Sequence, residues 1–296
     1  MTSEIGVGPS RADDEVQPGL AGFDAWARSY FAAKSRHDLD ALVGSFDPDI
    51  AYEDAVLCRR TLGADRMRAT YATIFAAAPD SARSTLTWST GGEGGGAVQF
   101  RNDAALFGAP MHVVAVIELD RGRVTRQRDY WDGRALPAPT LAGLRATYPA
   151  HLPPAGLAAA QRSPRAPVLG AAAQAYRAAL ESGSSIAGLL ADDAVLTDLA
   201  CGVQVVTRDA VATHVARWSA ALPYGRGARE TNVVGGAGGG AWEWTASPAF
   251  AGAVGAGITA VRLAADGRIA EMAFGWDTSR LSSRQHSDLR GPDDRA

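Results

Sequence analysis

Lysine is nearly absent from this chain of 296 residues. Of its 29 Lys and Arg residues only Lys34 is a lysine, a bias that we attribute to GC-rich coding. The formal net charge of −3 leaves no broad basic surface for a phosphate backbone, which argues against nucleic acid as a partner.

Cysteine, histidine and long apolar runs are scarce too. Cys58 and Cys201 are the only cysteines, and because they lie at nearly equivalent places of two separate halves, we expect two inert thiols and no disulfide. The five histidines lack metal-binding spacing, which predicts no metal site. No apolar run is long enough to span a membrane, and no signal peptide is recognisable, so we expect a cytoplasmic protein.

What the chain does contain is one pattern written twice. Three blocks recur in order at offsets of 144 and 145 residues: AYEDAVLC (51–58) with VLTDLACG (195–202), GGEGGGAVQF (91–100) with GGAGGGAWEW (235–244), and LDRGRVTRQRDYWD (119–132) with AADGRIAEMAFGWD (264–277). A register that slips by a single residue across three blocks indicates duplication, and each half is long enough to bury its own core.

Each half combines helices with a run of strands. Apolar residues between Phe23 and Phe46 recur at helical spacing with a break near His37–Asp38, which predicts two helices. A short strand at 50–54, a loop to Gly63 and a helix at 65–77 follow. Turn residues then divide the chain into four strands, "STLTWST", "AVQFRNDAALF", "MHVVAVIELD" and "RVTRQRDYWD". The order predicts an α+β fold: two tandem cone-shaped α+β barrel domains, each a curved antiparallel sheet around helices, paired as an intrachain pseudo-dimer.

The expected organisation has five parts. These are a disordered segment at 1–20, a first, catalytic domain at 21–135, a proline-rich linker at 136–168 with a short helix near 140–147, a second, structural domain at 169–279, and a polar, disordered tail at 280–296.

Acidic residues and an arginine on neighbouring strands suggest chemistry in the first half. Strand alternation places Arg101 and Asp103 on one face, and Asp129 and Trp131 on one face of another strand. If both faces point into the cavity, two carboxylates flank one guanidinium, which can separate their pKa values into a base and a proton donor. A structural Asp-Arg-Asp salt bridge, or exposed strand faces, would give the same spacing.

The second half lacks this group. The counterparts of Tyr52, Asp54, Arg101, Asp103 and Asp129 are Leu196, Asp198, Thr245, Ser247 and Phe274. We therefore expect the active site in the first half. The same alternation puts Glu243 toward the second cavity and Trp242 and Trp244 on the outer face, where they would pack against the Phe100 face of the first domain.

The motifs "AYEDAVL", "FRND" and "GRVTRQRDYWD" resemble the nuclear transport factor 2-like superfamily, with its SnoaL-like cyclases and ketosteroid isomerase, and within it limonene-1,2-epoxide hydrolase. The resemblance implies that Arg101 bridges the acids, Asp103 protonates an epoxide oxygen and Asp129 deprotonates the attacking water. Tyr52 and Asp54 would hold that water. Asp54 departs from the asparagine of the hydrolase, and the connection from Asp103 to Asp129 is shorter.

The same alignment predicts an apolar pocket wall for a small hydrophobic substrate. Its members would be Ile74, Ala105, Met111, Val113 and Trp131, although each of these side chains would serve equally well as plain core. We expect His112 on the outer face of the sheet.

Three functions follow from these features. The first is cofactor-independent epoxide opening, by water or by a hydroxyl of the same substrate, in a natural-product pathway. The second is a SnoaL-like polyketide cyclase or isomerase in which Asp129 removes a proton next to a carbonyl. The third is a non-catalytic protein that binds a hydrophobic ligand. An enzyme of the first kind needs Asp103 and Asp129 to converge on Arg101. Besides the intrachain pairing, a homodimer is possible.

Overall fold

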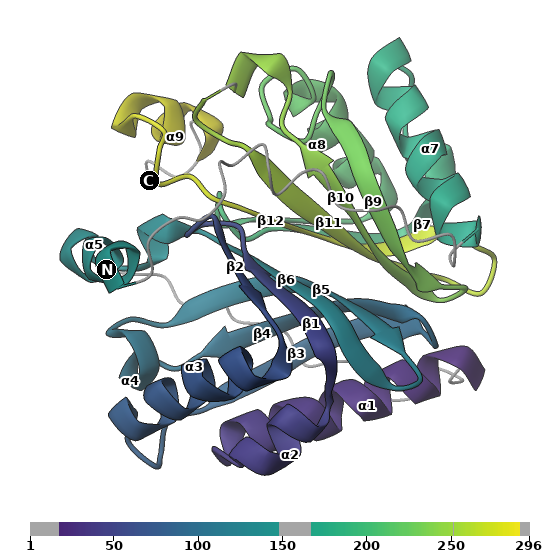
Figure 1. The fold of residues 1–296 in the computed structure, drawn as a ribbon. Helices are drawn as coiled ribbons and strands as arrows, with labels where there is room; N and C mark the ends of the chain where they lie inside the picture. Colours follow the sequence, from purple (N-terminus) through teal and green to yellow (C-terminus); the bar gives the residue numbers. More distant parts are fainter. Residues whose placement is uncertain (1–17, 148–166, 251, 291–296) are drawn as a thin grey trace.

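The computed structural model describes residues 18–147, 167–250 and 252–290 (Figure 1). Residues 1–17 of the expected disordered segment, most of the linker and the last six residues of the tail lie outside this range. Residues 18–20 begin a helix, and Ser283–Arg290 of the expected disordered tail form helix α9, so these two expectations were partly wrong. No helix in the described part of the chain is long and apolar enough to cross a membrane.

The first half is an α+β unit with one six-stranded sheet. Its elements are α1 (Pro18–Ser35), α2 (Leu39–Gly44), β1 (Phe46–Asp54), β2 (Arg59–Leu62), α3 (Ala64–Ala77), β3 (Ser84–Gly92), β4 (Gly95–Asn102), α4 (Ala104–Phe107), β5 (Met111–Asp120), β6 (Arg123–Trp131), η1 (Gly133–Ala135) and α5 (Ala138–Thr147). The strand order is β2-β1-β6-β5-β4-β3, in which only the β1–β6 pair is parallel. The sheet ends at β2 and β3, so it is not a closed barrel.

The second half repeats this topology. Its elements are α7 (Pro167–Ser182), η2 (Ala187–Leu189), β7 (Leu190–Asp198), β8 (Val203–Val206), α8 (Arg208–Trp218), β9 (Arg229–Gly236), β10 (Gly239–Thr245), η3 (Pro248–Phe250), β11 (Ala256–Leu263) and β12 (Ile269–Trp276), with sheet order β8-β7-β12-β11-β10-β9. Asp54 pairs with Asp129 across β1 and β6, and Asp198 pairs with Phe274 across β7 and β12. The strand registers thus agree with the alignment of the repeat, and the expected α+β class and tandem arrangement are confirmed.

Local sequence explains the helix boundaries and two differences from expectation. The break between α1 and α2 falls at His37, whose φ is +56°, and Asp38 caps α2 by accepting from the backbone N–H of Ala41. The expected loop to Gly63 contains β2, which pairs antiparallel with β1. The expected strand 97–107 stops at Asn102, because a helical turn, α4, follows directly.

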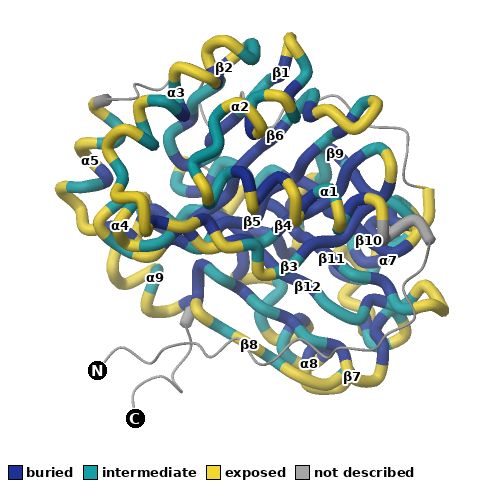
Figure 2. Tube along the Cα trace, turned by 90° about the horizontal axis from the view of Figure 1, so that it is seen from below, coloured by how far each residue is buried: buried dark blue, intermediate teal, exposed yellow. Residues whose placement is uncertain are grey.

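The two sheets pack face to face, with the helices α1, α2 and α3 on the outer side of one sheet and α7 and α8 on the outer side of the other (Figure 1). The central strands of both sheets are mostly buried (Figure 2). Trp242 and Trp244 lie in the core of the second domain, where they contact Tyr176 and Tyr224. Their expected place at the domain interface was wrong, because alternation turns these large apolar rings toward the helices.

Small side chains and a charged network fill the interface. Ala97, Val114, Ala241 and Ala260 belong to one interdomain apolar cluster, and Glu243, expected in the second cavity, lies here instead. Its carboxylate accepts hydrogen bonds from Arg126 of the first domain at 2.8 Å and Tyr130 at 2.7 Å, and from Asn232 of its own domain at 2.9 Å. The interface is therefore partly ionic.

The glycine-rich blocks of the repeat lie where the sheets come closest. A Cβ atom on Gly92 would stand 3.1 Å from the Cα of Gly236, and one on Gly236 would stand 3.0 Å from the carbonyl oxygen of Gly91. Next to them, the Thr90 hydroxyl donates to the Gly238 carbonyl at 3.0 Å. Glycine at these positions lets the β3–β4 and β9–β10 turns pack backbone to backbone.

Candidate active site

The first domain encloses a cavity of about 100 Å³ between its sheet and the helices that cover it. Its lining is mostly apolar with a few polar groups, as is usual for a small-molecule site. The lining residues are Lys34, His37, Tyr52, Asp54, Leu57, Arg59, Met67, Thr70, Tyr71, Ile74, Phe75, Ser84, Asn102, Leu106, Phe107, Met111, Val113, Asp129, Trp131 and Leu144.

Asp129 is the most firmly positioned carboxylate of this cavity. Alternation along β6 turns it to the same side as Gln127 and Trp131, as expected from the sequence. Its Oδ2 accepts from the Tyr52 hydroxyl at 2.9 Å and its Oδ1 from the Gln127 amide at 2.8 Å. The Tyr30 hydroxyl donates to the Gln127 carbonyl oxygen at 3.0 Å and thereby fixes which end of that amide faces Asp129. The carboxylate is held in one orientation.

The surroundings of Asp129 suit a general base. Only 7% of the residue is exposed, and burial raises the pKa of the carboxyl above its usual value. The charge of Lys34 and the hydrogen bonds from Gln127 and Tyr52 oppose this rise in pKa. A carboxylate with a raised pKa is a stronger base than a solvated one.

Asp54 ends β1 and caps the turn that follows. Its Oδ1 accepts from the backbone N–H groups of Val56 at 2.9 Å and Leu57 at 2.8 Å, and its Oδ2 accepts from the Trp131 indole at 3.1 Å. Burial raises the pKa of this carboxyl to about 7. The hydrogen bonds from Leu57 and Trp131 lower it, and the nearby Asp129 raises it further. Asp54 can therefore be protonated near neutral pH.

The second domain repeats this arrangement at Asp198. One oxygen accepts from the backbone N–H groups of Ala200 and Cys201, both at 3.0 Å, and from the Trp276 indole at 3.1 Å. The repetition shows that the aspartate at this position fastens the turn after the strand to the indole of the neighbouring strand. Asp54 has this structural role in addition to any chemical one.

Residues 27–127 match the family model described as "SnoaL-like domain". The first half of this chain is a SnoaL-like domain. The match ends two residues before Asp129, but it includes Tyr52, Asp54 and Lys34.

Several solved structures resemble part of this chain. A putative ketosteroid isomerase from Kribbella flavida DSM 17836 is 20% identical, over 38% of this chain and 78% of its own, with a TM-score of 0.33. A putative polyketide cyclase from Sinorhizobium meliloti is 25% identical, over 36% of this chain and 93% of its own, with a TM-score of 0.32. An NTF-2 like protein of unknown function from Burkholderia xenovorans LB400 is 19% identical, over 42% and 91%, with a TM-score of 0.33. No curated protein matches the chain.

The structure does not bring Arg101 and Asp103 to Asp129. The Arg101 side chain is 49% exposed and contacts Asp103 at 3.4 Å, and neither residue lines the cavity of the SnoaL-like domain. Asp103 follows the end of β4, where it accepts from the backbone N–H of Arg83 at 3.0 Å. The expected Asp-Arg-Asp convergence was wrong, because Phe100 and Asn102 take the inward positions of β4 and alternation does not continue past the strand.

The expected apolar wall is largely in place. Ile74, Met111, Val113 and Trp131 line the cavity, and their contact with a substrate stays a prediction. Ala105 does not line it, because it lies on the exposed side of α4; Leu106 and Phe107 of the same helix do.

Sequence reasoning missed Asn102, which lies between the two residues it selected. The Ser84 hydroxyl donates to the Asn102 carbonyl oxygen at 2.6 Å, and the Ser84 backbone N–H donates to the Ser35 hydroxyl at 3.1 Å. Because its oxygen is engaged by Ser84, the Asn102 amide nitrogen is the end available to the cavity. No pattern in the sequence marks this residue, because the register of β4 decides whether the Asn102 side chain faces the cavity.

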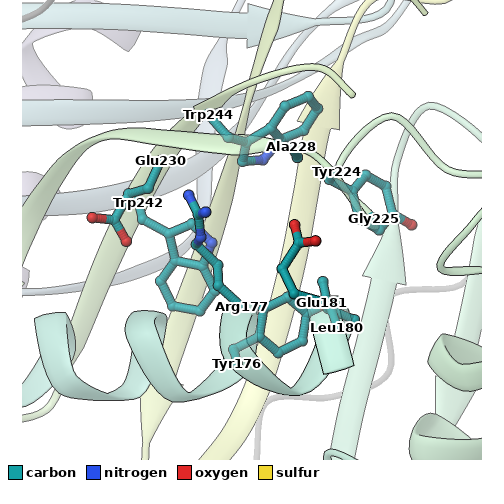
Figure 3. Close-up of a pocket in the computed structure, with 10 residues that line it drawn as sticks. All are labelled: Tyr176, Arg177, Leu180, Glu181, Tyr224, Gly225, Ala228, Glu230, Trp242 and Trp244. Atoms are coloured by element: carbon teal, nitrogen blue, oxygen red, sulfur yellow. The ribbon is translucent and has the colours of Figure 1, made fainter. Parts of the chain in front are cut away.

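The cavity between α7 and β10 of the second domain is much smaller. It measures about 10 Å³, which is room for about one water molecule. Figure 3 shows that aromatic rings fill this region: Tyr176 from α7, Trp242 and Trp244 from β10, and Tyr224 from the loop between α8 and β9. Phe274 takes the position of Asp129, and Tyr224 stacks on it with ring centroids 3.9 Å apart.

The raised pKa of Asp54 predicts a pH-dependent cost to stability. An acid whose folded pKa lies above its unfolded value is harmless below the unfolded pKa, near 3.8, and destabilises progressively as pH rises toward 7. We expect Asp54→Asn to lose the hydrogen bond to the Trp131 indole at all pH values, which destabilises the variant. The variant also lacks the ionisable carboxyl, so it is free of the destabilisation that grows with pH in the parent. The gap in melting temperature between the parent and the variant should therefore narrow between pH 4 and pH 8. A constant gap would contradict the raised pKa.

Proposed function

We propose that the SnoaL-like domain is a cofactor-independent isomerase or cyclase in which Asp129 removes a proton from the carbon next to a carbonyl group. The observation that carries the proposal is the placement of Asp129. It lies in an apolar cavity, 7% exposed, and is held by Tyr52 and Gln127. A small hydrophobic carbonyl compound fits this lining.

The polar groups divide the reaction between them. Asp129 takes the proton, and the electron pair of the broken C–H bond moves to the carbonyl oxygen to form an enolate. The amide nitrogen of Asn102, which lines the same cavity, would donate to that oxygen, and donors aimed at a developing oxyanion are an effective source of catalysis. The enolate carbon then takes a proton at another position, which is isomerisation, or attacks a second carbonyl, which is cyclisation.

Isotope exchange tests this step without knowledge of the natural substrate. The protein is incubated in D₂O with cyclohexanone, and incorporation of deuterium next to the carbonyl is followed by proton NMR. Exchange above the buffer rate supports the proposal. Exchange at the buffer rate, both with this ketone and with a larger aromatic one, would contradict it.

Epoxide opening is a second candidate because of one observation on Asp54. With Arg101 and Asp103 outside the cavity, the expected Asp-Arg-Asp mechanism lacks its proton donor. The carboxyl of Asp54, whose pKa is raised to about 7, is an acid inside the cavity that can protonate the epoxide oxygen while Asp129 deprotonates water. Formation of a diol from cyclohexene oxide, lost in Asp54→Asn, would favour this reaction.

A hydrophobic-ligand-binding protein is the alternative without catalysis. It would hold cyclohexanone or a larger ketone in the cavity and show neither deuterium exchange nor diol formation. Ligand-induced shifts in the NMR signals of the protein would then occur without turnover.

A further inference from the structure

Lys34, the only lysine of the chain, has no part in the reaction described so far. It lies near the end of α1 and lines the same cavity as Asp129. Its ammonium nitrogen stands 4.3 Å from the ring centroid of Phe100 and 5.5 Å from that of Phe31. Among the described residues, no carboxylate forms an ion pair with this nitrogen and no hydrogen bond to it is found. In the described part of the chain, the amine is thus presented to an apolar cavity with aromatic rings beside it but without an ion-pair or hydrogen-bond partner.

This environment changes the protonation of the amine. Burial lowers the pKa of Lys34 to about 8, and the negative charge of Asp129 opposes that change. At pH 7 the uncharged fraction is then about a hundredfold larger than for a lysine with the ordinary pKa of about 10.4. An uncharged, desolvated amine is the form that attacks carbonyl groups.

Two other roles are open to a lysine at this place. As a lasting cation it would act only through its charge, on Asp129 or on an anionic substrate group. An arginine would do the same, and every other cation of this chain except the histidines is an arginine. What an arginine cannot do is form a covalent bond to a carbonyl carbon, because guanidinium does not lose its proton in proteins.

We propose that Lys34 condenses with the carbonyl group of the substrate inside the cavity of the first domain, and that the substrate is therefore an aldehyde or a ketone that passes through an iminium ion. This rests on the proposed function, since it supplies the activated form of the compound from which Asp129 takes a proton. It adds a covalent step that the enolate route does not need.

The step balances without any further reagent. The uncharged Lys34 amine attacks the carbonyl carbon, and a proton moves from nitrogen to oxygen to give a neutral carbinolamine. The hydroxyl group of the carbinolamine takes up a proton from the solvent and leaves as water, which leaves a C=N⁺ bond; this proton returns to the solvent when the product is released. Asp129 then removes the proton from the adjacent carbon and the electron pair forms an enamine, with the positive charge neutralised. Protonation of the enamine and addition of water release the product and restore the amine.

Because the chain has one lysine, reductive trapping followed by peptide mapping can assign an adduct to Lys34. The full chain is incubated at pH 7 with benzaldehyde and sodium cyanoborohydride, and the mass of the intact protein and of its peptides is measured. We expect one benzyl group on Lys34, attached about a hundredfold faster than to the side chain of a free lysine derivative under the same conditions. Lys34→Arg, which keeps the cation, is the matched control and should lose this adduct.

Peptide mapping distinguishes the outcomes. The amino terminus is the other primary amine of the expressed chain, and labelling confined to it would overturn the proposal. Labelling of Lys34 at a rate no higher than that of the free lysine derivative would also overturn the proposal. This comparison uses only the parent protein, so it is valid even if Lys34→Arg fails to fold. If deuterium exchange continues at the parent rate in Lys34→Arg, the iminium is not an intermediate of the reaction, and the enolate mechanism of the proposed function stands without it. A Lys34 adduct without deuterium exchange would keep the amine site and contradict Asp129 as the base.

Discussion

Replacing Asp129 with asparagine should lower enzyme-dependent deuterium exchange into cyclohexanone by about 10²- to 10⁴-fold, the usual contribution of a positioned general base. The amide keeps the size of the carboxyl group and its oxygen can still accept from Tyr52 or Gln127, so the fold should persist. It cannot accept the proton of the substrate. Exchange rates by NMR, together with melting curves of both proteins, measure the effect.

Asp103→Asn is the matched control for this experiment. It removes the other acid that the sequence placed in the active site, but its side chain lies outside the cavity, where it accepts from the backbone N–H of Arg83. We expect exchange within about twofold of the parent, because a surface substitution away from the site rarely changes more. Full activity in Asp129→Asn would exclude this base. Loss of activity in a folded Asp103→Asn would restore the arrangement expected from the sequence.

The contrast between these two aspartates shows what strand periodicity can predict. On β6, Gln127, Asp129 and Trp131 alternate inside a regular strand that ends at Trp131, and the expected face was right. On β4, the strand ends at Asn102, so the two-residue period could not place Asp103. The residues after Asn102 have the composition of a strand, but they form the four-residue helix α4. The sequence alone does not show that the strand ends there.

Apolar residues were a better guide than charged ones to which side of a strand faces the core. Phe100 on β4 and the two tryptophans of β10 all point toward the helices of their own domains. The charged residues between or beside them, Arg101 and Glu243, must then face the other way. The positions of the neighbouring aromatic residues therefore predict the correct strand faces for Arg101 and Glu243, whereas the motif resemblance does not. The cavity role of Asn102 depends on its pairing with Ser84, a nonlocal contact that no local pattern encodes.

The arrangement of the domain interface leads to a second prediction, on stability. Glu243 is 1% exposed and is contacted by two arginines of the first domain, Arg126 at 2.8 Å and Arg128 at 3.2 Å. Burial alone would raise the pKa of Glu243, but the charges of Arg126 and Arg128 outweigh it and lower the pKa to about 2. The carboxylate is therefore ionised in the folded protein, and it joins the second domain to the first.

Glu243→Ala should lower the free energy of unfolding at pH 7 by about 3–5 kcal/mol, because it leaves buried arginine charge without one of its partners. Glu53 still contacts both arginines, which favours the lower end of this range. Asp192→Ala in the same domain is the control: Asp192 also contacts two arginines, at 2.9 Å and 3.0 Å, but is 75% exposed, and its loss should cost below about 1 kcal/mol. Urea denaturation of the three proteins measures both changes.

The sign of the pH effect follows from the depressed pKa of Glu243. Its contribution is present above the unfolded value near 4.5 and is lost as pH falls toward 2. The difference between the parent and Glu243→Ala should therefore shrink when the denaturation is repeated at pH 3, while Asp192→Ala stays close to the parent. If Glu243→Ala cost no more than Asp192→Ala at pH 7, the interface would be held by its apolar cluster alone. In that case the buried charges would serve to select which faces of the two sheets meet.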